Sequence, residues 1–119
     1  MGGSDLDSAE LARSAVDTLS DKQAEDIALL DLRDVCSFTD YFVIATGTST
    51  RQIRTLVEEV EQTIKNAGVR PLHIEGSDDT GWVLLDFGDV IIHVFAPRER
   101  EFYGLERLWR GAVPVVHIQ

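Results

Sequence analysis

The chain has 119 residues and a formal net charge of −10, which argues against direct binding to nucleic-acid phosphates because such binding needs clustered lysine and arginine. Hydrophobic residues make up 44% and charged residues 27%, and no apolar run approaches the roughly 20 residues of a membrane helix. The single cysteine, Cys36, allows no internal disulfide, and the acidic N-terminus lacks the apolar core of a signal peptide. We therefore expect a cytoplasmic protein, whose negative charge is compatible with a basic protein partner.

The first part of the chain predicts one helix and two strands. Apolar residues at helical spacing, preceded by Asp7 and Glu10 as a capping box, predict a helix over 8–20. Short apolar runs predict strands over 26–32 and 41–46, the second in the centre of a sheet because it is apolar throughout.

The clearest helix follows the second of these strands. Ser49 and Gln52 form another capping box, an apolar stripe follows, and Gly68 suits the left-handed position after a helix end. Residues 69–74 read as a strand, and Pro71 points to a sheet edge. Strand, helix and strand together predict a right-handed crossover between two parallel strands.

A tight β-hairpin is the most informative feature, because the runs WVLLDF and VIIHVF are separated only by Gly88 and Asp89. Side chains alternate along a strand, so this loop implies the register. One face would carry Phe87 with Val90, Leu85 with Ile92 and Val83 with Val94; the other would carry Trp82 with Phe95, Leu84 with His93 and Asp86 with Ile91.

The first hairpin face is wholly apolar and must be buried. The second mixes large apolar groups with a carboxylate and an imidazole, and two interpretations stay open. It is either a sheet side covered by the chain's own helix, with Asp86 and His93 at its rim, or a docking surface for another protein.

The C-terminal part is expected to be helical after Pro97, with a break at Gly104. The apolar ending, 110–119, is expected to pack on the domain or on a second copy. The resulting fold class is α/β: a single domain over 1–119, with its core at about 8–109 and a mixed sheet of about five strands with flanking helices.

Few residues suggest catalysis. Thr46-Gly47-Thr48-Ser49-Thr50 could hold a phosphate at a helix start, but capping explains it and no nucleotide-binding glycine motif is present. Asp86 and Asp89 could hold magnesium for nucleotidyl transfer, but they need not converge. The histidines show no metal-ligand spacing, so we expect no enzyme, metal or cofactor.

Three blocks in order, SFTDYFVIATGTSTRQI, GWVLLDFGDVIIHVF and REREFYGLERLW, resemble the ribosomal silencing factor (Iojap-like) family from Phe38 to Trp109. The resemblance implies a nucleotidyltransferase-related fold without known catalysis. It also implies a translational repressor that binds the large ribosomal subunit through its protein numbered fourteen and blocks small-subunit joining. Organellar relatives act in large-subunit assembly, and members can form homodimers.

Carried onto this chain, the resemblance implies a partner surface on the mixed hairpin face and the segment after it. Trp82 would be its apolar anchor, and the carboxylates would meet basic groups of the partner. Phe102 and Leu108 are expected to pack inward. An alternative is a nucleotidyltransferase-class enzyme using Asp86 or Asp89. The residues expected at the surface are Trp82, Asp86, Asp89, His93, Arg98, Tyr103, Leu105 and Glu106.

Overall fold

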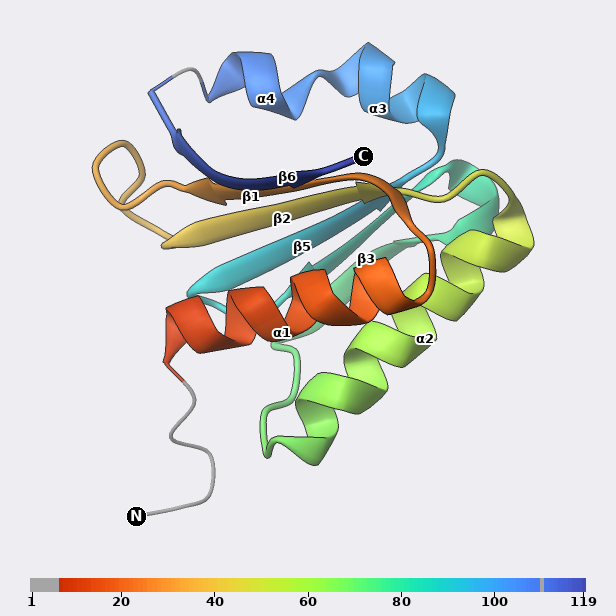
Figure 1. The fold of residues 1–119 in the computed structure, drawn as a ribbon, viewed down its shortest axis with the longest axis horizontal. Helices are drawn as coiled ribbons and strands as arrows, with labels where there is room; N and C mark the ends of the chain where they lie inside the picture. Colours follow the sequence, from red (N-terminus) through yellow and green to blue (C-terminus); the bar gives the residue numbers. More distant parts are fainter. Residues whose placement is uncertain (1–6, 110) are drawn as a thin grey trace.

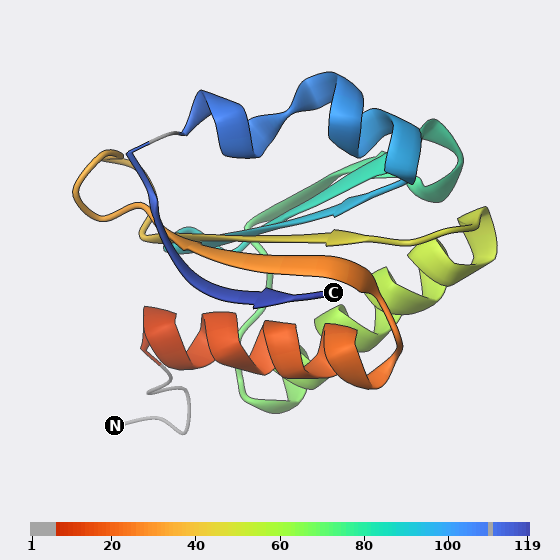
Figure 2. The ribbon, with the colours of Figure 1, turned by 45° about the horizontal axis from the view of Figure 1, so that its top comes forward.

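A computed structural model of the chain describes residues 7–109 and 111–119; the remainder of the expected domain, residues 1–6 and Arg110, lies outside the described residues. It has three layers: a mixed sheet with α1 and α2 on one face and α3 and α4 on the other (Figures 1 and 2). The elements are α1 (Ser8–Asp21), β1 (Glu25–Asp31), β2 (Tyr41–Thr46), α2 (Thr50–Asn66), β3 (His73–Ser77), the short 3-10 helix η1 (Asp78–Thr80), β4 (Trp82–Asp86), β5 (Val90–Phe95), α3 (Pro97–Tyr103), α4 (Leu105–Leu108) and β6 (Val113–Ile118).

The six strands lie in the order β3-β4-β5-β2-β1-β6. Among the described strands, only β2 and β5 are parallel neighbours, and every other neighbouring pair is antiparallel. β3 therefore runs parallel to β2, as the strand-helix-strand pattern predicts, but β5 and β4 lie between them. None of the helices in the described ranges is both long and apolar enough to cross a bilayer.

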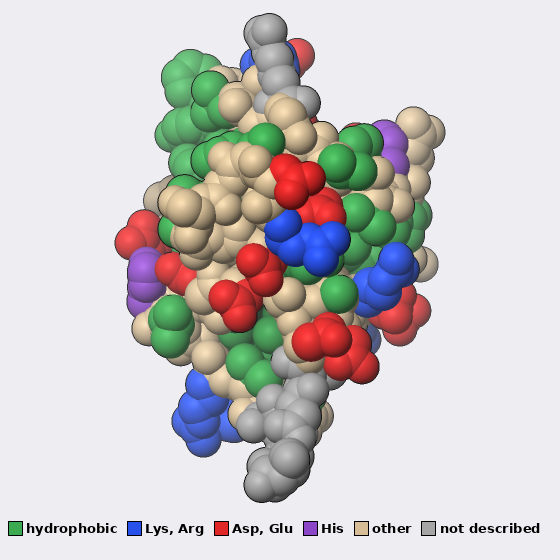
Figure 3. All heavy atoms as spheres, turned by 90° about the vertical axis from the view of Figure 1, so that its left-hand side faces the viewer, with side chains coloured by type: hydrophobic (Ala, Val, Ile, Leu, Met, Phe, Trp, Pro, Cys, Tyr) green, Lys and Arg blue, Asp and Glu red, His purple; other side chains and the backbone are tan. Residues whose placement is uncertain are grey.

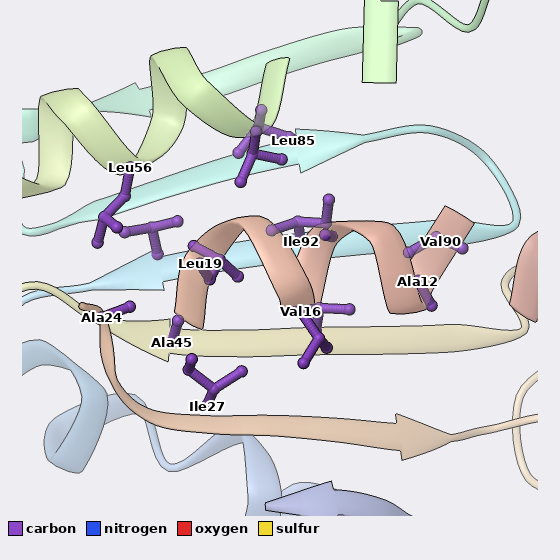
Figure 4. Packing of buried hydrophobic residues seen from close by; sticks show 14 of the residues in the cluster. Ala12, Val16, Leu19, Ala24, Ile27, Ala45, Leu56, Leu85, Val90 and Ile92 are labelled. Carbon is purple, nitrogen blue, oxygen red and sulfur yellow. The ribbon is translucent and has the colours of Figure 1, made fainter. Parts of the chain in front are cut away.

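The main core lies between the sheet and the helices α1 and α2, where buried aliphatic side chains from both layers interdigitate (Figure 4). Val16 and Leu19 of α1 and Leu56 of α2 meet Leu85 and Ile92 of the sheet. These helices form because their apolar residues recur at helical spacing and their first turns are capped. Asp7 and Glu10 make the expected capping box, and Ser49 accepts the backbone N–H of Gln52.

The hairpin register is confirmed. Trp82 pairs with Phe95, Leu84 with His93 and Leu85 with Ile92, and the Phe87 N–H donates to the Val90 carbonyl across the turn. The apolar face packs into the main core.

One expectation about the sheet margins needs correction. The strand after α2 begins at His73 and not at residue 69, because residues 69–72 with Pro71 form the connection to it. The expected mixed sheet of about five strands is confirmed: six strands are present, and the sixth is the C-terminal ending, which forms β6 and pairs with β1. The ending thus packs on its own domain, one of the two outcomes expected from its apolar character.

The second sheet face is covered by the chain's own helices α3 and α4, which cross it after β5 (Figure 2). Gly104 separates them with left-handed backbone angles, φ 53° and ψ 47°. Leu105 and Trp109 consequently pack toward the sheet. Phe102 and Leu108 were expected to pack inward, but they are 77% and 71% exposed, because α3 turns Tyr103 toward the aromatic residues of the sheet and α4 turns Leu105 toward it.

Candidate functional site

An aromatic cluster connects the mixed sheet face to α3. The Trp82 ring stacks on Phe95 at 4.9 Å between centroids and lies 4.5 Å from the Tyr103 ring of α3. His93 lies beside both Trp82 and Phe42, at 5.9 and 4.7 Å. The hairpin brings Trp82 and His93 together because they are diagonal neighbours on one face of the two strands.

The structure corrects the expected position of His93. Its side chain is 3% exposed, so it belongs to the interior and not to a partner surface or a rim. Trp82 Nε1–H, which can only donate, donates to His93 Nδ1 over 3.1 Å. His93 is therefore neutral with its proton on Nε2, and this buried N–H finds no acceptor among the described residues. Burial lowers the pKa of His93 to about 3.

The buried imidazole makes stability depend on pH in a defined window. An unfolded chain protonates His93 near its ordinary pKa of 6.5, whereas the folded chain resists protonation down to about 3. The unfolded state thus binds more protons as pH falls through this window, so stability decreases toward acid, by up to about 1.4 kcal/mol per pH unit from this group. We expect equilibrium urea unfolding between neutral pH and pH 5 to show this slope, with a smaller slope in His93→Gln. Equal slopes in both proteins would contradict it.

Trp82 itself is half-buried and borders a hollow at the surface. The hollow has a volume of about 250 Å³ and is lined by Trp82, Leu84, Tyr103 and the edge of β3. Its walls are largely apolar side chains, with Glu75 and Thr80 at the margin. Trp82 thus packs on Phe95 and His93 on its inner side and remains partly exposed beside the hollow.

The hairpin turn places carboxylates at one end of the sheet. Asp89 is exposed in the turn, and its carbonyl accepts the backbone N–H groups of Asp40 and Tyr41. Asp86 is half-buried and accepts the Gly88 N–H over 2.8 Å, so it lies at the margin of the covered face, as expected. Acidic side chains outnumber basic ones on the view of this end (Figure 3).

The remaining expected surface residues lie along α3 and α4. Arg98 is exposed and Leu105 is half-buried against the sheet. Glu106 is engaged within the chain, because Arg100 Nη2 donates to its carboxylate over 2.6 Å. Of the residues expected at the partner surface, the structure brings Trp82 and Tyr103 into contact. Asp89 lies in the hairpin turn and Arg98 at the start of α3.

Sequence reasoning missed Arg100, which fastens α3 to the sheet. The Arg100 side chain is only 12% exposed, and its guanidinium donates to the Asp26 carbonyl, the Thr46 hydroxyl and the Glu106 carboxylate. These partners line a cavity of about 510 Å³ between β1, β6 and the two C-terminal helices. The REREFY pattern carried no signal for this, because Arg98 and Arg100 look equivalent until the helix is docked.

The alternative of nucleotidyl transfer gains no support from this geometry. Asp86 is used in the hairpin turn, and no group of three potential metal-ligating side chains occurs within the described ranges. The start of α2 is capped by its own Ser49, and the hollow beside it is bordered by Asp78, Asp79 and Glu99. Carboxylates there would repel a phosphate in the absence of a cation.

The fold and this face define a small acidic α/β domain with a half-buried tryptophan packed in an aromatic cluster beside a surface hollow. The family model described as "Ribosomal silencing factor during starvation" matches residues 5–119. The chain belongs to the ribosomal silencing factor family.

Individual relatives agree with this assignment. A protein named ribosomal silencing factor RsfS from Halalkalibacterium halodurans is 34% identical over 96% of this chain and 97% of its own length. A mouse protein named mitochondrial assembly of ribosomal large subunit protein 1 is 38% identical over 79% of this chain and 42% of its own length. A crystal structure of a Chromobacterium violaceum protein matches with a TM-score of 0.84 and 35% identity, over 95% of this chain and 94% of that one. The expected family and α/β fold are confirmed.

Proposed function

We propose that this chain binds the large ribosomal subunit through its protein numbered fourteen and sterically prevents the small subunit from joining. The observation that carries the proposal is the family match over nearly the whole chain. The chain would act by its bulk and not by catalysis, because a docked domain of 119 residues at the intersubunit face obstructs joining without any reaction. A cytoplasmic setting and a homodimer of the free protein belong to the same proposal.

The partner surface would centre on Trp82 and Tyr103, with Asp86 and Asp89 at one side. An apolar anchor beside carboxylates suits a small basic protein, since burial at the centre supplies affinity while opposite charges supply orientation and rate. Net charge of −10 favours approach to such a partner but not to bare ribosomal RNA.

Sucrose-gradient sedimentation with purified subunits tests the proposal. The protein should travel with the large-subunit peak and reduce the joined-ribosome peak when added before the small subunit. The salt concentration should be kept fixed, because electrostatic contributions fall as ionic strength rises. A protein that stays at the top of the gradient and leaves joining unaffected would show that this chain does not silence ribosomes.

The mouse relative's name motivates a second candidate, a role in assembly of the large subunit. That role predicts association with incomplete large-subunit particles in a fractionated lysate, together with an excess of such particles when the protein is depleted. Association with mature subunits and normal particle composition after depletion would favour silencing alone.

A further inference from the structure

The β3 strand forms an open edge of the sheet. It stands at one end of the strand order, pairs with β4 on one side only, and all five of its residues are exposed. Within the described residues no strand pairs with its outer side, so backbone groups there are available to an added strand. Gly76, with φ 83°, ends the regular part, which leaves His73 to Glu75 as the pairing stretch.

The opposite edge is protected in a way that β3 is not. Pro114 lies within β6 and has no backbone N–H to offer, and the register between β6 and β1 shifts next to it, between Leu29 and Leu30. Proline and irregular register are two devices by which edge strands avoid pairing with other chains. Strand addition is therefore favoured at β3.

Two hollows flank β3, one on each face of the sheet. On the α3 side lies the hollow of about 250 Å³ beside Trp82, to which β3 contributes Glu75. On the α2 side lies a second hollow of about 220 Å³, whose apolar floor contains Val57, Ile74 and Val83. An added strand would point successive side chains alternately into these two hollows.

The rim of the α2-side hollow identifies the chemistry of the occupant. Four charged side chains line this hollow, and two of them, Arg54 and Asp78, form an ion pair over 2.6 Å. The other two, the carboxylates of Glu58 and Glu61, have no ion pair within the described chain. An apolar floor below carboxylates fits the aliphatic stem and charged head of arginine or lysine. The Trp82 side, with its largely apolar walls, fits an aliphatic side chain.

We propose that β3 accepts an extended protein segment as a seventh strand, with basic side chains directed at Glu58 and Glu61 and apolar side chains directed at Trp82. The backbone pairing supplies part of the affinity, and the two hollows select the alternating basic and apolar pattern. This inference goes beyond ribosome binding, with which it shares only Trp82 and Tyr103. It specifies a partner by its chemistry, an alternating cationic segment.

The test is titration of the full isotope-labelled chain with a short peptide in which arginine and leucine alternate, followed by amide NMR. The largest shifts and new protection from hydrogen exchange should fall on residues 73–75. Methylating alternate peptide nitrogens should weaken binding about tenfold, because the strand pairing is lost. An isomer with its arginines and leucines in two blocks should bind at least about fivefold more weakly.

A pair of matched double variants tests the charge argument. Glu58→Lys with Glu61→Lys should weaken the peptide about tenfold. The control, Asp17→Lys with Asp21→Lys, changes the net charge by the same amount at exposed positions of α1. It should change the peptide affinity by less than about twofold.

Three outcomes would overturn the proposal: the largest shifts on β6, equal binding by the methylated peptide, or equal weakening by both double variants. Protection of β3 that rises with protein concentration and without peptide would identify a second copy as the occupant instead. Because the peptide assay contains no ribosome, its result is independent of the subunit-joining experiment.

Discussion

Leu85→Ala is expected to reduce the free energy of unfolding by about 2–5 kcal/mol. The Leu85 side chain is 0% exposed and lies on the hairpin face that meets α1 and α2 (Figure 4). Truncation loses the transfer free energy of the removed atoms and leaves a cavity that the surrounding strands and helices cannot fully close. Denaturant unfolding followed by circular dichroism measures the loss.

The neighbouring residue provides the control. Asp86 points to the opposite face, is half-buried and accepts one N–H, that of Gly88. Asp86→Ala is therefore expected to cost only about 1 kcal/mol. Equal losses in the two variants would mean that the faces of the hairpin are wrongly assigned.

Trp82→Ala is expected to weaken binding to the large subunit by about 2 kcal/mol or more, roughly thirtyfold in affinity. The indole is held by its stack on Phe95 and by its hydrogen bond to His93, so it is presented in one orientation. Because the indole is already fixed in the free protein, it loses little conformational entropy when the partner binds. Its removal therefore loses contact area whose contribution to affinity is not offset by such an entropy cost. Sedimentation with purified subunits should show the variant neither in the large-subunit peak nor reducing the joined peak.

Two further variants separate the anchor from other causes. Leu108→Ala truncates an apolar side chain that is 71% exposed on α4, and it should bind as the unmodified chain does. Asp86→Lys should weaken binding beyond Trp82→Ala, because it sets like charge against a basic partner. Thermal unfolding of each variant checks that it remains folded. If Leu108→Ala abolishes binding and Trp82→Ala does not, the partner surface lies on the outer side of α3 and α4.

Local sequence patterns were sufficient to predict the hairpin register and the starts of two helices. The two-residue turn at Gly88 and Asp89 allowed the hairpin register to be predicted, because such a short loop leaves one pairing and alternation then assigns every side chain to a face. The caps at Asp7 and Ser49 located two helix starts for the same reason: their hydrogen bonds span only three residues.

Only the tertiary structure decided what covers the mixed face and how. The left-handed backbone at Gly104 separates α4 from α3, and the docked helices direct Tyr103 and Leu105 toward the sheet and leave Phe102 and Leu108 exposed. The docking of these helices buries His93 but leaves Trp82 half-buried. Both residues lie on the same face of the hairpin, so the alternation of side chains along a strand cannot predict this difference in exposure. The edge positions of β3 and β6 likewise follow from pairings between distant segments. Such pairings depend on the whole set of packed surfaces, and no local period in the sequence encodes them.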